Sequence, residues 1–203
     1  MNYKKKRLVK LKELLFFSNN KNKIVEINHL FKNYKLKIIS PNDFNFFNDP
    51  KEIGNSFAEN AKIKSLYGYK NFQIACFAED SGICIEALDW KPGIYSKRFL
   101  DKYKNKVECF EDIINKVKAT GKGKAYFQTS VCLTLEQNYH IVFEGKVYGT
   151  ISLKIRGKSG FGYDPIFIAN NELETFSQMS QIRKNKISHR SIAINKLINF
   201  LFN

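Results

Sequence analysis

Apolar runs of strand length alternate with helical periodicity through the first half of the chain, and this alternation restricts the possible folds more than any other feature. The run Leu14–Phe17 is continuous and apolar, which is typical of a buried strand. After an Asn-rich turn, Ile24, Ile27 and Phe31 recur at helical spacing. This alternation of strand and helix signals predicts an α/β fold.

The other predicted elements extend the pattern and add an antiparallel section. A predicted capping box, with Ser56 at the N-cap and Glu59 at N3, opens a helix that runs to about Tyr69. Two β-rich stretches, 124–135 and 139–148, are expected to pair as a long hairpin. Further strands are expected over 36–39, 74–78, 83–88 and 151–155, and helices over 107–117 and from Ser188 onward. Together these elements predict a mixed α/β sheet.

Length and composition indicate an ordinary globular protein. The 203 residues suit one domain, or one domain with two lobes, and 43% hydrophobic with 26% charged residues is normal globular composition. The chain lacks an apolar run long enough to span a membrane. Residues 1–12 are rich in lysine and do not have the pattern of a secretory signal. We therefore expect a basic N-terminal extension over 1–12 and a single domain over 13–203.

The cysteines and the net charge give information on location and partners. The four cysteines, Cys76, Cys84, Cys109 and Cys132, form neither a C-x-x-C pair nor a metal-binding pattern with histidines. We therefore expect buried, reduced thiols in a cytoplasmic protein. The net charge of +15 is compatible with a nucleic-acid, membrane or anionic-substrate partner, and equally with compositional drift in an AT-rich genome. Lysine far outnumbers arginine, which is the usual residue for recognising phosphates and bases, so the charge alone carries little weight.

A polar loop joins the first predicted strand to the first predicted helix. It has the sequence Ser18-Asn19-Asn20-Lys21-Asn22-Lys23. A helix N-terminus attracts phosphate through its N–H groups, and Lys23 lies in the first turn, where a cation is unfavourable unless an anion is near. The alternative is an Asn-rich turn with a solvated lysine.

Carboxylates follow the third predicted strand. Glu79 and Asp80 are expected at its C-terminal end, where α/β sheets gather ligands and where a divalent cation would find oxygen ligands. The alternative is an acidic turn. Glu52 precedes the capped helix, and Lys64 shares a helical face with Phe57, where it could equally extend along apolar surface towards solvent.

A glycine-rich loop and a basic helix start make up a third group. The loop, residues 160–165, contains Phe161, Tyr163 and Asp164, and aromatic faces stack on bases. Lys184 and the run Ser188-His189-Arg190 supply hydrogen-bond donors for a purine or a phosphate. The alternatives are a tight turn with core aromatics and a capped, solvated helix end.

Taken in order, these motifs resemble the inosine/xanthosine triphosphate pyrophosphatase family, also called Ham1-like. The family's T-G-N-x-x-K loop corresponds to 18–23, and its E-x-G-x-x-F-x-E-N-A-x-x-K block to 52–64. The D-D-S-G-L and P-G-x-Y-S-x-R-F blocks correspond to 79–83 and 92–99. The blocks G-F-G-Y-D-P-x-F and K-x-x-x-S-H-R lie at 160–167 and 184–190.

The resemblance implies an α/β fold with a mixed, elongated central sheet flanked by helices, two lobes around a deep substrate cleft, and a homodimer. It implies Mg²⁺-dependent hydrolysis of dITP, ITP and XTP to the monophosphate and pyrophosphate, which removes deaminated purines from the nucleotide pool. Neither a stable nucleic-acid partner nor a membrane is expected.

The resemblance also implies a role for each motif residue. Glu52 and Asp80 would hold Mg²⁺, and Asp80 would be the catalytic base that activates water. The substrate would be bound by Ser18, Asn19, Asn20, Lys21, Asn22, Lys23, Lys64, Ser81, Phe161, Gly162, Tyr163, Asp164, Lys184, His189 and Arg190.

Four positions depart from the family pattern, one of them only by Ile83 in place of leucine, and two other functions compete with this one. Ser18 replaces threonine, Asn19 replaces a glycine that a positive φ would favour, and Glu79 replaces aspartate, so whether Glu79 also binds metal is left open. The alternatives are a non-enzymatic nucleic-acid binder and an enzyme of the same fold with drifted specificity or lost activity. A nucleic-acid binder would not explain Glu52, Glu79 and Asp80, which repel phosphate unless a metal is present.

Overall fold

The computed structural model describes residues 11–203, which form a mixed α/β fold. The strands are β1 (Glu13–Phe16), β2 (Lys37–Ile39), β3 (Cys76–Ile85), β4 (Lys91–Pro92), β5 (Lys124–Glu136), β6 (Tyr139–Ile151) and β7 (Phe167–Ala169). The α-helices are α2 (Lys21–Phe31), α3 (Phe57–Phe72), α4 (Ser96–Leu100), α5 (Lys106–Thr120), α6 (Gln181–Ile187) and α7 (His189–Phe202).

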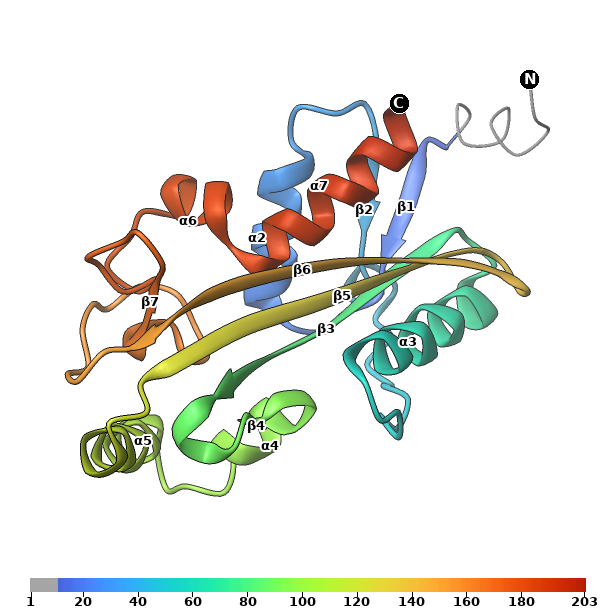
Figure 1. The fold of residues 1–203 in the computed structure, drawn as a ribbon. Coiled ribbons are helices and arrows are strands. Elements are labelled where there is room, and N and C mark those ends of the chain that lie inside the picture. The colour runs from blue at the N-terminus through green and yellow to red at the C-terminus, as the bar shows by residue number, and fades with distance from the viewer. Residues whose placement is uncertain (1–10) are drawn as a thin grey trace. The chain divides into compact units, whose positions relative to one another are not determined.

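The strands pair in one sheet that contains both parallel and antiparallel neighbours. Their order is β2-β1-β3-β5-β6-β7, and β4 pairs with β3 (Figure 1). β1 is parallel to β2 and β3, whereas β4 and β7 run antiparallel to β3 and β6. The predicted mixed sheet is confirmed.

The described chain divides into two compact units. Unit 1 contains residues 11–80, 130–145 and 191–203, and unit 2 contains 81–129 and 146–190. β3, β5 and β6 each contribute residues to both units. The substrate cleft and the single domain over 13–203 stay predictions. Of the expected basic extension, only residues 11 and 12 are described, and 1–10 lie outside the described part.

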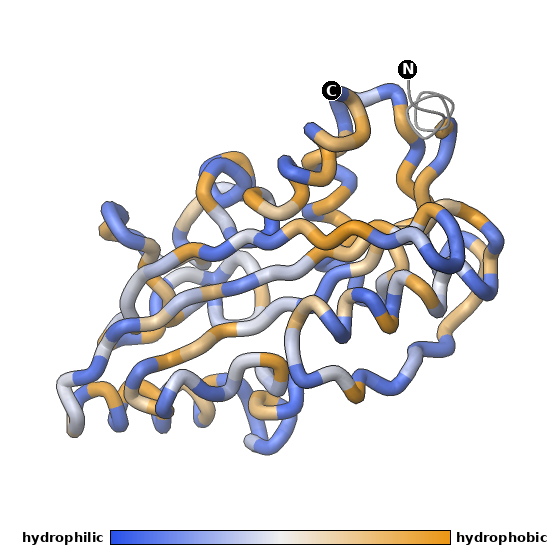
Figure 2. Tube along the Cα trace, turned by 45° about the vertical axis from the view of Figure 1, so that its right-hand side comes forward, coloured by the Kyte–Doolittle hydropathy of each residue, from blue (hydrophilic) through white to orange (hydrophobic). Residues whose placement is uncertain are grey.

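Helices cover both faces of the strands in unit 1 (Figure 1). Successive strand residues point to opposite faces, so Leu14 and Phe16 pack with α2 and α7, while Leu15 packs on the side of α3. α7 buries Ala193, Ile194, Leu197, Ile198 and Leu201, and hydrophilic residues interrupt its hydrophobic ones in Figure 2. This two-sided core explains why the early strands are continuous apolar runs.

Unit 2 has its own core, built around α5. The side chain of Asn105 caps this helix by accepting the Glu108 N–H, and the helix ends at Gly121, which has φ of +69°. Its buried face, including Ile113 and Val117, packs with residues of β3, β5 and β7. The helix predicted over 107–117 is confirmed, as are the long hairpin, formed by β5 and β6, and the final helix after Ser188.

Several local predictions were wrong. β3 is one continuous strand over Cys76–Ile85, so the strands predicted over 74–78 and 83–88 are not separate. Glu79 and Asp80 therefore lie inside this strand and not at a C-terminal end, and no acidic turn forms there. The strand predicted over 151–155 does not form, because β6 already ends at Ile151. The capping box is half formed: Ser56 Oγ accepts the Glu59 N–H, but the Glu59 carboxylate accepts from the Asn55 N–H rather than from Ser56. α4 and α6 were not predicted; α4 lies where a loop to about Lys104 was expected.

Two further expectations can be compared with the structure. All four cysteines are buried and have free thiols, as predicted. Within residues 11–203, the helices are all too short or too polar to cross a bilayer.

Candidate active site

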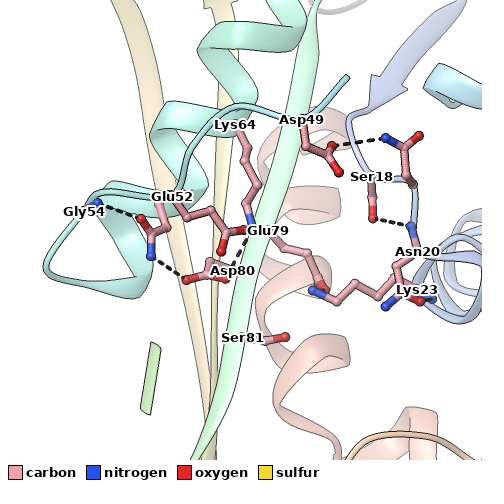
Figure 3. A network of polar contacts seen from close by, with 12 residues as sticks. Ser18, Asn20, Lys23, Asp49, Glu52, Gly54, Lys64, Glu79, Asp80 and Ser81 are labelled. Carbon is pink, nitrogen blue, oxygen red and sulfur yellow. Dashed lines mark hydrogen bonds and ion pairs between the residues drawn. The ribbon is translucent and has the colours of Figure 1, made fainter. Parts of the chain in front are cut away.

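A lysine and two carboxylates from separate segments of unit 1 meet at one point (Figure 3). Lys64 extends from α3, on the face that also carries the buried Phe57 and Ala61. Its Nζ lies 2.7 Å from Glu52 Oε1 and 3.3 Å from Asp80 Oδ1. The structure thus brings together the two predicted metal ligands, and the Lys64 ammonium contacts the carboxylates of both.

Electrostatics keep Lys64 charged despite its burial. Burial lowers the pKa of the ammonium, but the negative charges of Asp80 and Glu52 and their hydrogen bonds outweigh this, so the pKa lies above its ordinary value. The position between Glu52 and Asp80 therefore favours positive charge.

Asn60 was not singled out by the sequence analysis, although it contacts Asp80 directly. Its side-chain amide donates to Asp80 Oδ2 at 3.1 Å, and its amide oxygen accepts the Gly54 N–H at 2.9 Å. Asn60 lies four residues before Lys64 and three after Phe57, so helical spacing places all three on one face. A polar residue on that face was the signal that could have found it.

Glu79 points away from this cluster. Consecutive strand residues face opposite sides of a sheet, so Glu79 and Asp80 diverge within β3. The fully buried Glu79 carboxylate lies 3.0 Å from Lys23 Nζ, and Figure 3 shows the two side chains directed at each other. Glu79 is thus the anion that offsets a cation in the first turn of α2.

The loop before α2 is held mainly by its own polar side chains. Asn20 is the N-cap, and its oxygen accepts the N–H groups of Asn22 and Lys23 at 3.0 and 3.3 Å. These N–H groups are therefore not free, contrary to the expectation for a bare helix N-terminus. Ser18 Oγ accepts the Asn20 N–H, and the Asn19 amide donates to Asp49.

The remaining loop positions differ in exposure and conformation. Asn19 has a negative φ, so the residue replacing the family's glycine needs no special conformation here. Lys21 and Asn22 are exposed at the start of α2.

In unit 2, the buried Lys184–Asp164 ion pair and Arg190 lie beside one aromatic ring, that of Phe161. Lys184 Nζ lies 2.7 Å from Asp164 Oδ2, and both side chains are less than 5% exposed. The same oxygen of Asp164 accepts the Phe161 N–H at 2.8 Å. Lys184 Nζ and Arg190 Cζ lie 4.9 and 5.3 Å from the centre of the partly exposed Phe161 ring. Arg190 also donates to Ser81 Oγ at 3.2 Å.

The structure places two other predicted site residues inside the core of unit 2. Tyr163 is buried against Phe110, and its hydroxyl donates to the Ser96 carbonyl at 2.8 Å. Burial raises the pKa of Tyr163 well above its ordinary value, so it stays a neutral donor. The buried His189 ring stacks on Phe127 with centroids 4.5 Å apart. Gly162, beside Tyr163, has φ of +61°.

The donor chemistry of unit 1 suits a hard divalent cation. Within residues 11–203, no three His, Cys, Asp or Glu side chains gather as a complete metal cage. Magnesium sites of nucleotide enzymes commonly use only one or two carboxylates, with water and substrate phosphates completing the coordination. Glu52 and Asp80 fit that requirement, whereas Glu79 faces the other side of β3.

The fold and these polar networks define an α/β protein with paired carboxylates and lysines suited to a cation and an anionic ligand. A family model described as "Ham1 family" matches residues 14–200. The chain belongs to the Ham1 family.

Individual relatives match over nearly their full length. The dITP/XTP pyrophosphatase of Borrelia duttonii is 41% identical, with 94% of this chain and 98% of the relative covered. The dITP/XTP pyrophosphatase of Porphyromonas gingivalis is 34% identical with the same coverage. The solved structure of a HAM1 protein from Coxiella burnetii superposes with a TM-score of 0.84 at 31% identity, covering 94% of this chain and 98% of that one.

Proposed function

We propose that this protein is a nucleoside-triphosphate pyrophosphatase that hydrolyses dITP, ITP and XTP to the monophosphate and pyrophosphate. The observation that carries the proposal is the meeting of Glu52, Lys64 and Asp80. Relatives that carry the name dITP/XTP pyrophosphatase and match over 94% of this chain support the choice of substrate. By removing deaminated purines, the enzyme would keep them out of DNA and RNA.

The carboxylates and lysines around Asp80 and Glu79 handle the phosphates. Glu52 and Asp80 would hold Mg²⁺, which would supply positive charge to neutralise the phosphates of the bound triphosphate. Lys64 and Lys23 add positive charge, and the Ser18–Asn20 loop, together with the exposed side chains of Lys21 and Asn22, donates to phosphate oxygens. Asp80 accepts a proton from the water that attacks the α-phosphorus, and pyrophosphate departs.

The residues around Phe161 recognise the base. The Phe161 ring offers a stacking surface, and Lys184 and Arg190 beside it donate hydrogen bonds to a 6-oxo group. A 6-amino group is itself a donor, so adenine would leave these donors unpaired. Ser81 accepts a hydrogen bond from Arg190, and Gly162 follows Phe161 in the chain. Tyr163 and His189 are buried and support the 160–165 loop and the start of α7 from the core.

Asp164 also takes part in base recognition. Lys184 and the Phe161 N–H already orient its carboxylate. The N1–H of a 6-oxopurine needs a hydrogen-bond acceptor, and among these side chains Asp164 provides it.

We also propose that the enzyme is a cytoplasmic homodimer without a stable nucleic-acid partner. Four reduced, buried cysteines support a reducing compartment.

A substrate panel tests the proposed function. Pyrophosphate release is measured at alkaline pH with Mg²⁺, with dITP and XTP compared with dATP and dGTP. We expect kcat/KM to favour dITP over dATP by about 10²-fold or more, as in sites that hydrogen-bond a substrate group. No turnover of any triphosphate by the folded protein would refute the enzymatic function, and steeply salt-dependent nucleic-acid binding would then support the alternative.

A further inference from the structure

Asn60 is a buried polar residue whose two ends are both occupied. Its exposed fraction is 2%, and it lies in the first turn of α3. A backbone N–H can only donate, so the amide oxygen of Asn60 must face Gly54 and the amide NH₂ must face Asp80. The orientation of this amide is therefore determined by its partners.

These two hydrogen bonds link the Asp80 carboxylate to the backbone of the segment that carries Glu52. On one side, the donor to Oδ2 leaves Asp80 Oδ1 directed at the shared cation position with Lys64. On the other side, Gly54 is two residues from Glu52, so the hydrogen bond from the Gly54 N–H to Asn60 restrains the segment that carries the Glu52 carboxylate. A Cβ at Gly54 would lie 2.8 Å from the Asn60 amide oxygen, which shows how closely the segment approaches α3.

We propose that Asn60 is a positioning residue that sets the separation of Glu52 and Asp80 for the divalent cation. This inference rests on the proposed function and deepens it, since it adds a residue that touches neither metal nor nucleotide. Groups that orient metal ligands commonly change metal affinity or activity by about 10- to 100-fold when removed.

Few other side chains could do this. Alanine or leucine would leave the partly buried Gly54 N–H and one buried oxygen of Asp80 without their Asn60 partner. Aspartate could still accept from Gly54, but it would have no donor for Asp80 and would add like charge beside it.

The experiment compares Asn60→Ala with Asn71→Ala, without nucleotide. Asn71 lies on the same helix, but its exposed amide donates only to the Tyr67 carbonyl, so it is a matched control. Mn²⁺ binding is measured by calorimetry, and exchange of the Gly54 amide hydrogen is followed by mass spectrometry or NMR. We expect Asn60→Ala to bind Mn²⁺ about 10- to 100-fold more weakly and to lose protection at Gly54, and Asn71→Ala to match wild type.

Turnover separates positioning from a purely structural role. With dITP, Asn60→Ala should lower kcat and raise the Mn²⁺ concentration needed for half-maximal rate, while KM for dITP at saturating metal stays near wild type. A folded Asn60→Ala protein with wild-type Mn²⁺ affinity would overturn the inference.

Two further outcomes keep the inference independent of folding and of the substrate. If Asn60→Ala does not fold, hydrogen exchange of the Gly54 amide is measured in the wild-type protein. Fast exchange would overturn the inference, because the hydrogen bond from Gly54 to Asn60 would be absent, and slow exchange supports it. Weakened Mn²⁺ binding in Asn60→Ala without any triphosphate turnover would refute the proposed function alone, whereas turnover with unchanged Mn²⁺ affinity would refute only the role of Asn60.

Discussion

Replacing Lys64 with methionine should reveal how strongly the carboxylate pair depends on a cation. Methionine keeps most of the apolar stem but removes the ammonium that lies 2.7 Å from Glu52 and 3.3 Å from Asp80. Breaking a buried ion pair by removing one partner costs about 3–5 kcal/mol. The Glu52 side chain is 33% exposed and partly screened, so the lower end of that range applies.

The expected loss is therefore about 3 kcal/mol, which lowers Tm by about 6–12 °C for a chain of this size. Differential scanning fluorimetry or calorimetry of metal-free protein measures it. Lys62→Met is the matched control, because Lys62 is exposed on the same helix. Its effect should stay within about 0.5 kcal/mol, as for most surface substitutions.

Metal addition gives the second half of this prediction. Mg²⁺ should raise the Tm of Lys64→Met more than that of wild type, because it restores positive charge between Glu52 and Asp80 where no ammonium competes. Equal Tm values for Lys64→Met and Lys62→Met in metal-free buffer would refute the electrostatic reasoning.

Three further predictions concern the rest of the site and the core. Glu79→Gln should leave Mn²⁺ affinity at the wild-type value in calorimetry and raise KM for dITP, because Glu79 faces Lys23 rather than Asp80; a large loss of Mn²⁺ affinity would contradict this. Gly160→Ala should weaken discrimination between dITP and dATP in the pyrophosphate assay, because a Cβ at this residue, whose φ is +77°, would lie 2.3 Å from Asp164 Oδ2. Burial, and then the charge of Asp112, raise the pKa of Cys109 from 9.0 to about 11. The folded state thus holds this proton more tightly than the unfolded state, so the free energy of unfolding should fall from pH 9 to about pH 11 in urea titrations, and less so in Cys109→Ala.

The regular elements could be predicted because their signals are local. Leu14–Phe17, the Asn-rich turn and the spacing of Ile24 and Ile27 predict β1 and α2, and the structure confirms both. Gly121 ends α5 with positive φ, as a glycine after a helix commonly does.

The errors arose where partners distant in sequence decide local structure. Ser81 and Gly82 suggest a turn, but pairing with neighbouring strands keeps them inside β3. That continuity separates Glu79 from Asp80, because strand geometry turns adjacent side chains to opposite faces. Asn60 was not predicted as a site residue, because its role depends on contacts with Gly54 and with Asp80, which lies 20 residues away in the sequence.

The candidate site was predicted more fully than its geometry. The motifs named Glu52, Lys64 and Asp80, which the structure brings together, but no sequence pattern shows that one ammonium bridges both carboxylates. Likewise, the Gly160–Pro165 motif could not show that Phe161 is partly exposed while Tyr163 is buried in the core.

The most direct test of the proposed metal-centred hydrolysis is the rate of pyrophosphate release from dITP by Asp80→Asn. Wild type and Asp101→Asn, which alters an exposed carboxylate in unit 2, are measured beside it. We predict that Asp80→Asn lowers kcat/KM by about 10²- to 10⁴-fold, the range expected for loss of a general base, and that Asp101→Asn retains the wild-type value. Wild-type activity in a folded Asp80→Asn protein would contradict the proposed role of Asp80.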